Sequence, residues 1–336
     1  MPKTMNFKHL ATFALAALAL TSSPWAASQT LLNASYDVAR EFYKDYNLAF
    51  SAHYKKTTGK DVKIDQAHGG SSAQARAVAD GLDADVVTFN TTTDIDFLAS
   101  KGLVASDWTK RFPHGAAPTT STMLFLVRQG NPKNIKDWDD LIKPGVQVVV
   151  VNPKTGGNGR MAYLAAWGSV RKKGGTDAQA AEFVAKLYKN VPILAKGGRD
   201  ATTVFLQRNI GDVLITFESE VVSVDREFGA GKVDAIHPAS SIVAENPVAV
   251  VERTVAKKGT ADVAKAYLDY LYSDEAQEIA AKHALRPRSP AILKKYAATF
   301  KPIQLFTVQD YFGSLAEAQK VHFNDGGQFD KLYTVK

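Results

Sequence analysis

The sequence predicts an α/β protein of two domains, each a mostly parallel β-sheet with helices on both faces. Three observations predict it. Short apolar strands alternate with segments of helical spacing, which is typical of parallel sheets covered by helices. Glycine-rich turns follow several strands and precede helices. The pattern breaks near 113–120 and 240–248, so we expect a two-connection hinge, with 29–118 and 246–336 as a discontinuous first domain and 119–245 as the second.

Residues 1–28 have the pattern of a signal peptide. Lys3 and Lys8 form a basic start, 10–20 is an apolar run too short to span a bilayer, and small residues follow it. We expect cleavage after Ala27 or Ser28, although a retained N-terminal anchor is the alternative. In a bacterium, export by this route would place the mature protein in the periplasm.

Composition limits the possible functions. The chain has 336 residues and no cysteine, so disulfides and thiolate metal sites are excluded. Its 41 basic and 34 acidic residues give a net charge of +7, and loss of Lys3 and Lys8 leaves 39 basic residues and +5. These basic residues are scattered, which does not favour nucleic-acid binding, whereas a mild positive field would attract small anions.

The elements of the first domain follow in order. A strand at 31–35 precedes a helix whose aromatic and apolar residues are spaced four apart, and Gly59 is placed to end that helix. Further strands are expected at 61–65 and 85–89, and helices at 72–80 and from Asp94. After the second break, a strand at 248–251 and helices at 261–272 and 274–283 return to this domain, followed by C-terminal helices.

The second domain has the same alternation. Strands are expected at 122–127, at 146–151 and at 212–217, and the unbroken apolar run of the second is typical of a strand buried on both faces. Helices are expected around Met161–Trp167 and at 176–190.

Three glycine turns indicate an anion site. They lie at 66–72, 152–159 and 195–200, each before a helix, and Tyr36 and Asp37 precede the first helix. The exposed N–H groups of helix N-termini attract anions, so an anion held there needs no contact with lysine or arginine. Ser71 either caps its helix or binds the ligand through its hydroxyl. A fully ionised tetrahedral dianion fits best, because phosphate keeps a proton that would need an acceptor; ordinary capped turns are the structural alternative.

The sequence lacks the common catalytic motifs. There is no H-E-x-x-H helix, no G-x-S-x-G elbow and no P-loop, and the seven histidines are dispersed. We therefore expect no catalytic residue, metal or cofactor. His68 either supports its loop or touches the ligand, and Asp37 either caps a helix or touches the ligand. Arg199 could pair with Asp94, support a loop carbonyl or lie on the surface.

Several motifs carry a family resemblance. They are Ser-Tyr-Asp at 35–37, Ile-Asp-Gln at 64–66, His-Gly-Gly-Ser at 68–71, Asn-Pro-Lys-Thr at 152–155, Tyr-Leu-Ala-Ala-Trp-Gly at 163–168, Gly-Asp-Val-Leu-Ile at 211–215 and Phe-Asn-Asp-Gly-Gly at 323–327. In this order they resemble the periplasmic sulfate- and thiosulfate-binding proteins of bacterial ABC importers. The resemblance implies a two-domain periplasmic-binding fold of type II that closes over a dehydrated oxyanion, and an inner-membrane ABC permease as partner of a monomeric receptor.

The resemblance also implies the site. The backbone N–H groups of Asp37, Ser71, Gly157, Asn158 and Gly198 should donate to the anion, as should the Ser71 hydroxyl. His68, Asp94, Thr155 and Arg199 should lie behind them. Gly156 and Phe217 depart from the sulfate-binding pattern, because a serine hydroxyl and a tryptophan indole are expected there; Thr155 could supply a hydroxyl instead. A less polar pocket near Phe217 would suit the terminal sulfur of thiosulfate.

Two other classes of function remain open. One is a binding protein of the same fold for phosphate, molybdate or ferric iron, although iron would need clustered tyrosines or carboxylates at the turns. The other is a periplasmic hydrolase of sulfate or phosphate esters, which would need a nucleophile with a base or a metal site.

Overall fold

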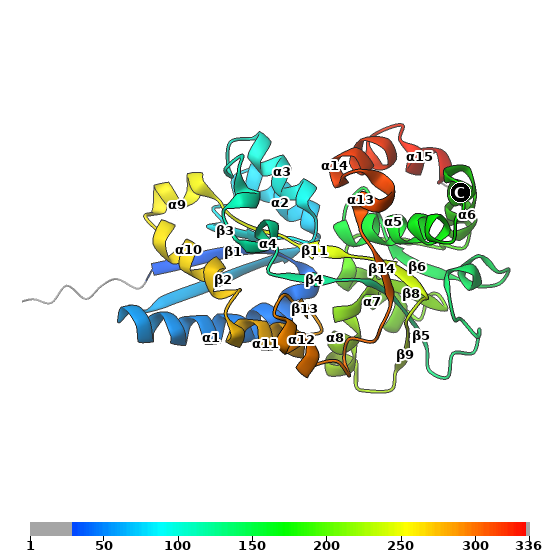
Figure 1. The fold of residues 1–336 in the computed structure, drawn as a ribbon, viewed down its shortest axis with the longest axis horizontal. Helices are drawn as coiled ribbons and strands as arrows, with labels where there is room; N and C mark the ends of the chain where they lie inside the picture. The colour runs from blue at the N-terminus through cyan, green and yellow to red at the C-terminus, as the bar shows by residue number, and fades with distance from the viewer. Residues whose placement is uncertain (1–28, 334–336) are drawn as a thin grey trace, which may run out of the picture.

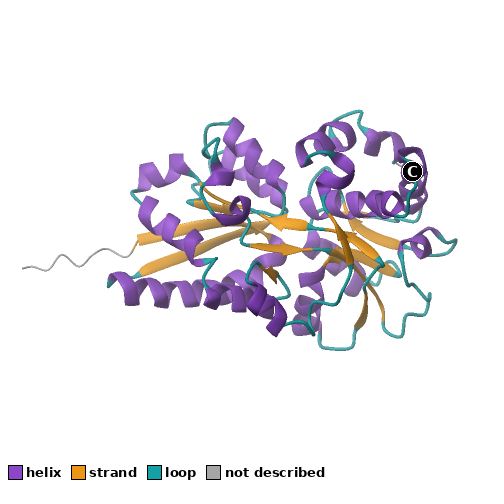
Figure 2. Cartoon of the chain, in the orientation of Figure 1, coloured by secondary structure: helices purple, strands orange, loops and turns teal. Residues whose placement is uncertain are grey.

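The computed structural model describes residues 29–333 and consists of two α/β units joined through a narrow middle (Figure 1). The predicted signal peptide lies outside the described residues. Helices cover both faces of the strands in each unit (Figure 2). Among residues 29–333, no helix combines the length and apolar character needed to cross a membrane.

The first unit contains a four-stranded sheet in the order β12-β3-β1-β2, in which only β12 runs antiparallel. Its strands are β1 (Gln29–Tyr36), β2 (Val62–Gly69), β3 (Val86–Thr88) and β12 (Val248–Val250). Helices α1 and α11 lie along one face, and α2 and α3 along the other (Figure 1). The helices of this unit are α1 (Arg40–Thr58), α2 (Ser71–Ala79), α3 (Thr92–Ser100), α9 (Glu252–Lys258), α10 (Ala261–Tyr270) and α11 (Asp274–Lys282).

The aromatic residues spaced four apart place α1 against the core. Tyr46 and Phe50 are fully buried, and their rings meet the ring of Tyr267 on α10 edge-on at 5.0 and 5.1 Å. Gly59 ends the helix with φ of 73°, a left-handed conformation that residues with a side chain rarely adopt. The helix and its end are therefore as the sequence predicts.

The second unit contains a five-stranded sheet in the order β7-β6-β8-β5-β9, in which only β5 runs antiparallel. Val148 and Val150 of β6 pack with α5 and α6, whereas Val149 and Val151 pack with α7 and α8, so β6 is buried on both faces. The elements are β5 (Met123–Arg128), β6 (Val148–Val151), β7 (Leu194–Ala195), β8 (Val213–Phe217), β9 (Val233–Ile236), α5 (Gly157–Lys172), α6 (Asp177–Lys189), α7 (Gly198–Leu206) and α8 (Glu218–Phe228).

The connections between the units pair with each other. Strand β4 (Thr119–Ser121) enters the second unit, β11 (Ala244–Asn246) returns to the first, and the two pair antiparallel. Strand β13 (Arg286–Pro287) pairs with β4 on its other side. The two breaks in the sequence pattern thus correspond to adjacent strands.

The C-terminal segment lies elsewhere than expected. After α12 (Pro290–Lys295) the chain crosses to the second unit a further time, where β14 (Gln304–Phe306) pairs with β10 (Ser240–Ile242). Helices α13 (Val308–Phe312), α14 (Leu315–Ala318) and α15 (Gln328–Leu332) then pack with the core of the second unit.

The sequence analysis assigned 246–336 to the first domain, and for these C-terminal helices that assignment is wrong. The physical reason is that α5 and α6 have an apolar surface, which the C-terminal helices bury. Phe329 supplies part of it, with its ring 5.3 Å from that of Tyr188, as does Phe323, 5.1 Å from Tyr163.

His322 makes this packing sensitive to acid. Its Nδ1 lies 3.0 Å from the Tyr163 hydroxyl, its ring meets Trp167, and burial lowers its pKa to about 4. The unfolded chain therefore binds a proton more readily, and the free energy of unfolding should fall as pH drops from 6.5 towards 4.

The substitution His322→Gln tests this assignment, because glutamine keeps an acceptor for the Tyr163 hydroxyl but does not titrate. The thermal midpoint should fall less between about pH 7 and about pH 5 in His322→Gln than in wild type; equal falls would contradict this assignment.

Candidate functional site

The three glycine turns meet where the two units face each other. A Cβ added to Gly70, at the end of β2, would lie 3.4 Å from the carbonyl oxygens of both Thr155 and Lys196. A Cβ on Gly197 would lie 3.8 Å from the Cα of Gly70. Segments far apart in the sequence are thus in close backbone contact at the glycine turns.

Each turn leads into a helix whose N-terminus is open. Gly70, Gly156 and Gly197 are the N-cap residues of α2, α5 and α7, and none of them has a side chain that could cap the helix. The first N–H groups of a helix have no partner within it, and they carry the positive end of the helix dipole. The cleft therefore brings several unsatisfied donors and positive dipole ends together.

The carboxylate of Asp37 links the first unit to the second by a hydrogen bond. Oδ2 accepts from the backbone N of Arg199 at 3.0 Å, and Oδ1 accepts from the backbone N of Val38 at 3.1 Å. Burial raises the pKa of this carboxyl, although the two N–H donors act against the rise. A Cβ on Gly197 would lie 2.8 Å from Oδ2, so the contact also accounts for that glycine. The side chain of Asp37 is thus a cap, and its own backbone N–H remains a predicted anion donor.

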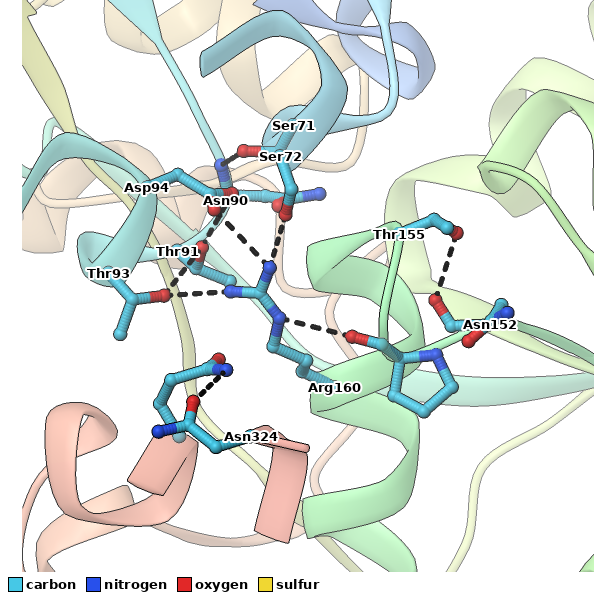
Figure 3. A network of polar contacts seen from close by, with 12 residues as sticks. Ser71, Ser72, Asn90, Thr91, Thr93, Asp94, Asn152, Thr155, Arg160 and Asn324 are labelled. Atoms are coloured by element: carbon cyan, nitrogen blue, oxygen red, sulfur yellow. Dashed lines mark hydrogen bonds and ion pairs between the residues drawn. The ribbon is translucent and has the colours of Figure 1, made fainter. Parts of the chain in front are cut away.

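Ser71 and Asn90 lie opposite the start of α5. Ser71 is 1 % exposed, and its Oγ lies 3.5 Å from the backbone N of Asn90 (Figure 3). A Cβ on Gly157 would lie only 2.0 Å from Oδ1 of Asn90. The sequence analysis did not identify Asn90, because an asparagine after a strand also occurs in ordinary turns.

Gly70 and not Ser71 is the N-cap residue of α2, so Ser71→Ala should test ligand binding by the hydroxyl. If the hydroxyl donates to a charged ligand, its loss removes roughly 1.5–3 kcal/mol and weakens anion binding by about one to two decades. Thr176→Ala is the matched control, since Thr176 caps α6 by accepting from the backbone N of Gln179 away from the cleft. The control should lower the thermal midpoint and leave affinity unchanged, and calorimetric titration of both variants is the measurement. A Ser71→Ala variant that behaves like the control would disprove the ligand role.

Arg160 ties α5 to the first unit (Figure 3). Its guanidinium donates to Thr93 at 2.8 Å, to the Ser72 hydroxyl, and to Oδ1 of Asp94 at 3.3 Å, while Nε donates to the carbonyl of Pro153 at 3.2 Å. The side chains of Arg160 and Asp94 are both 7 % exposed. The sequence analysis missed Arg160, and its suggestion that Asp94 pairs with Arg199 is wrong.

Arg199 is held within the second unit instead. It pairs with Glu220 at 3.0 Å and with Glu227, both on α8. Thr202 also donates to Glu220 at 2.7 Å, and burial raises the pKa of this fully buried glutamate despite both donors. The guanidinium of Arg199 is thus paired with carboxylates of α8, which lie behind α7.

Thr155 connects two of the turns. Its Oγ1 lies 3.2 Å from the carbonyl oxygens of Asn152 and Lys196. A hydroxyl has one proton, and these two acceptors occupy it, so Thr155 does not replace the missing serine hydroxyl. Thr155 therefore links the second and third glycine turns.

His68 is neutral at the end of β2. Burial lowers its pKa to about 4, and the charge of Arg40 lowers it further, while Nδ1 is buried and has no hydrogen-bond partner among the described residues. A neutral imidazole adds no countercharge to the cleft. Its position within β2, beside Ser35 of β1, favours support of the turn.

Gly156 and Phe217 occupy tight positions. A Cβ on Gly156 would lie 2.9 Å from Cγ1 of Val151, so a serine there would require Val151 to move. Phe217 ends β8, is 1 % exposed and precedes α8.

Lys154 anchors the second turn to the C-terminal segment. Its Nζ lies 2.8 Å from Asp330, 3.4 Å from Asp325 and 3.2 Å from the carbonyl of Asn324. The 323–327 and 152–155 motifs are therefore in contact, although 170 residues separate Lys154 from Asn324. Within residues 29–333, no group of three or more His, Asp or Glu side chains is arranged to hold a metal ion.

Residues 31–286 match the family model of the bacterial extracellular solute-binding proteins. The chain belongs to this family. It is 55% identical to the thiosulfate-binding protein of Pseudomonas aeruginosa over 96% of this chain and 98% of that protein. It is 50% identical to the sulfate-binding protein of Escherichia coli over 96% and 97%.

A solved relative confirms the fold of this solute-binding protein. The sulfate-binding protein SubI from Mycobacterium tuberculosis H37Rv is 32% identical, with a TM-score of 0.79 over 86% of this chain and 98% of that chain. The two-domain periplasmic-binding fold of type II predicted from the sequence is therefore confirmed. A solute-binding protein is a transport component and not an enzyme, as expected.

Proposed function

We propose that this chain captures sulfate or thiosulfate in the periplasm and delivers it, as a monomer, to an inner-membrane ABC permease. The names of its relatives support the anion, membership of the solute-binding family supports a transport role, and the basic, short apolar start of the sequence supports export. The proposed ligand residues are Asp37, Ser71, Gly156, Gly157, Asn158, Gly198 and Phe217, with His68, Asp94, Thr155 and Arg199 behind them.

One observation carries the proposal: three glycine-capped helix N-termini meet between the two units, while Arg160 and Arg199 are paired with carboxylates. Arg160 is bound to Asp94 and Arg199 to Glu220. An anion in this cleft would be held by fixed N–H dipoles that replace its hydration shell. Such a cage favours an anion whose oxygens all accept hydrogen bonds.

Asp37 supports sulfate or thiosulfate over phosphate. A phosphate that keeps its proton needs an acceptor in the site, and the Asp37 carboxylate is hydrogen-bonded to the start of α7. Both of its oxygens already accept backbone N–H groups, from Val38 and Arg199. At Asp37, a phosphate hydroxyl would therefore have to share an oxygen that already accepts a backbone N–H.

The choice between sulfate and thiosulfate depends on Gly156 and Phe217. These positions supply neither a hydroxyl nor an indole N–H, so a sulfate oxygen directed at them would lack a donor. The phenyl ring of Phe217 offers an apolar surface that suits the larger terminal sulfur of thiosulfate. Both features favour thiosulfate.

Calorimetric titration of the chain without its predicted signal peptide tests the proposal. Sulfate, thiosulfate, phosphate and molybdate should be compared at neutral pH and matched ionic strength. We expect one site that binds thiosulfate and sulfate, with phosphate at least about tenfold weaker, because an unmatched buried donor costs roughly 1–3 kcal/mol. Absence of binding by both sulfur oxyanions, or phosphate binding of equal strength, would contradict the proposal.

A further inference from the structure

The side chain of Asn158 lies among the predicted ligand positions. Asn158 is the second residue of α5 and is 3 % exposed. Its Nδ2 lies 3.5 Å from the position that a Cβ on Gly198 would take, and donates at 3.3 Å to Oγ1 of Thr216, the residue before Phe217. The carboxamide is therefore close to the starts of α5 and α7 and to the end of β8.

One end of this carboxamide has no partner. Oδ1 of Asn158 is buried and makes no hydrogen bond to any described residue. A lone acceptor next to a cleft of anion donors is unfavourable, because it would repel the oxygens of the ligand. In this orientation the NH₂ group of Asn158 has a hydrogen-bond partner and the oxygen has none.

Rotating the Asn158 carboxamide by 180° would exchange the positions of its oxygen and its NH₂ group, so that the lone buried acceptor is replaced by a donor. The oxygen and the NH₂ group have nearly the same shape, so hydrogen bonds decide which way the side chain faces. After rotation, Oδ1 accepts from the Thr216 hydroxyl, and the NH₂ group takes the unpartnered place. A buried NH₂ donor then needs an acceptor, which an oxyanion in the cleft would supply.

Asn90 shows the same feature from the other unit. Its Oδ1 is also buried and without a partner in the described part of the chain, and it lies 2.0 Å from a Cβ built on Gly157, the residue before Asn158. Two unsatisfied carboxamides, one from each unit, thus flank the N-terminus of α5. In contrast, the carboxamide of Asn190 donates to the carbonyls of Leu141 and Lys143 at 2.9 and 3.1 Å.

We propose that the side-chain NH₂ group of Asn158 donates to the bound oxyanion. This inference rests on the proposed function and adds a side-chain contact to a position from which only the backbone N–H was expected. Thr216 is the positioning residue that holds the carboxamide in the rotated orientation.

Titration of sulfate and thiosulfate into wild type, Asn158→Ala, Asn158→Asp and the control Asn190→Ala tests the contact. We expect Asn158→Ala to weaken both anions about tenfold and Asn158→Asp, which has the same shape but adds negative charge, by about a hundredfold or more. Asn190→Ala should bind as wild type does. The thermal midpoint of unliganded Asn158→Ala should fall slightly, because the buried Thr216 hydroxyl loses its partner.

The outcomes separate this contact from the proposed function. If wild type binds neither anion, the proposed function fails, and the contact fails with it. If wild type binds and Asn158→Ala binds equally well, only the contact is wrong, and the side chain serves Thr216 alone. If Asn158→Ala does not fold, Asn158→Asp decides, since an unchanged affinity in that variant also overturns the contact.

Discussion

Gly157→Ala is expected to lower anion affinity by about a hundredfold. The new Cβ would lie 2.0 Å from Oδ1 of Asn90 and 2.6 Å from Cγ2 of Thr91, both in the first unit. The two units could then no longer approach as they do here, and overpacking of this kind costs up to about 3 kcal/mol. The fold of each unit should survive, because the clash arises only between them. Calorimetry for affinity and small-angle scattering for the opening of the cleft are the measurements.

Gly70→Ala is the matched control for this prediction. Its Cβ would lie 3.4 Å from the carbonyl oxygens of Thr155 and Lys196, an ordinary contact distance. The control should therefore lose much less affinity than Gly157→Ala. Adding Asn90→Ala and Thr91→Ser to Gly157→Ala removes the clashing atoms and should restore closure in scattering. Equal losses in the two glycine variants would show that the close approach at Gly157 is not what matters.

Arg160→Met is expected to lower affinity by about two decades. It removes the donors to Ser72 and Thr93 and leaves the carboxylate of Asp94 without its ion-pair partner in a nearly dry contact. Removing one partner of a buried ion pair costs about 3–5 kcal/mol. Opening of the cleft would rehydrate Asp94, so the open form should be favoured and the affinity should fall more than the thermal midpoint.

A second substitution identifies the cause of that loss. Asp94→Asn combined with Arg160→Met removes the uncompensated charge while keeping an acceptor for the Thr91 hydroxyl, which lies 2.9 Å from Asp94. The double variant should therefore bind more tightly than Arg160→Met. If the two bind alike, the stranded charge is not responsible, and the contacts to Ser72 and Thr93 account for the effect.

Local features of the fold were predictable, since they depend on nearby residues. The four-residue spacing of Phe42, Tyr46 and Phe50 predicts the buried face of α1, and Gly59 predicts its end. The glycines before α2, α5 and α7 likewise predict open helix N-termini, because the residue type itself determines what can cap a helix.

Contacts between distant segments were not predictable in the same way. Arg160 lies in a helix whose spacing says nothing of Asp94, 66 residues away, and the partners of Arg199 were likewise not apparent. The C-terminal helices are short and loop-separated, so periodicity does not show which unit they cover. Lys154, Asn90 and the orientation of the Asn158 side chain became apparent only when the two units were seen together.

A crystal structure of the protein with thiosulfate tests the central claim most directly. That claim is that an oxyanion is held by backbone N–H groups of helix N-termini without contact to a cationic side chain. The account predicts oxygens at roughly 2.7–3.2 Å from the backbone N atoms of Ser71, Gly157 and Gly198. It also predicts that Arg160 stays on Asp94 and Arg199 on Glu220. An anion bound by either guanidinium, or bound outside this cleft, would contradict it.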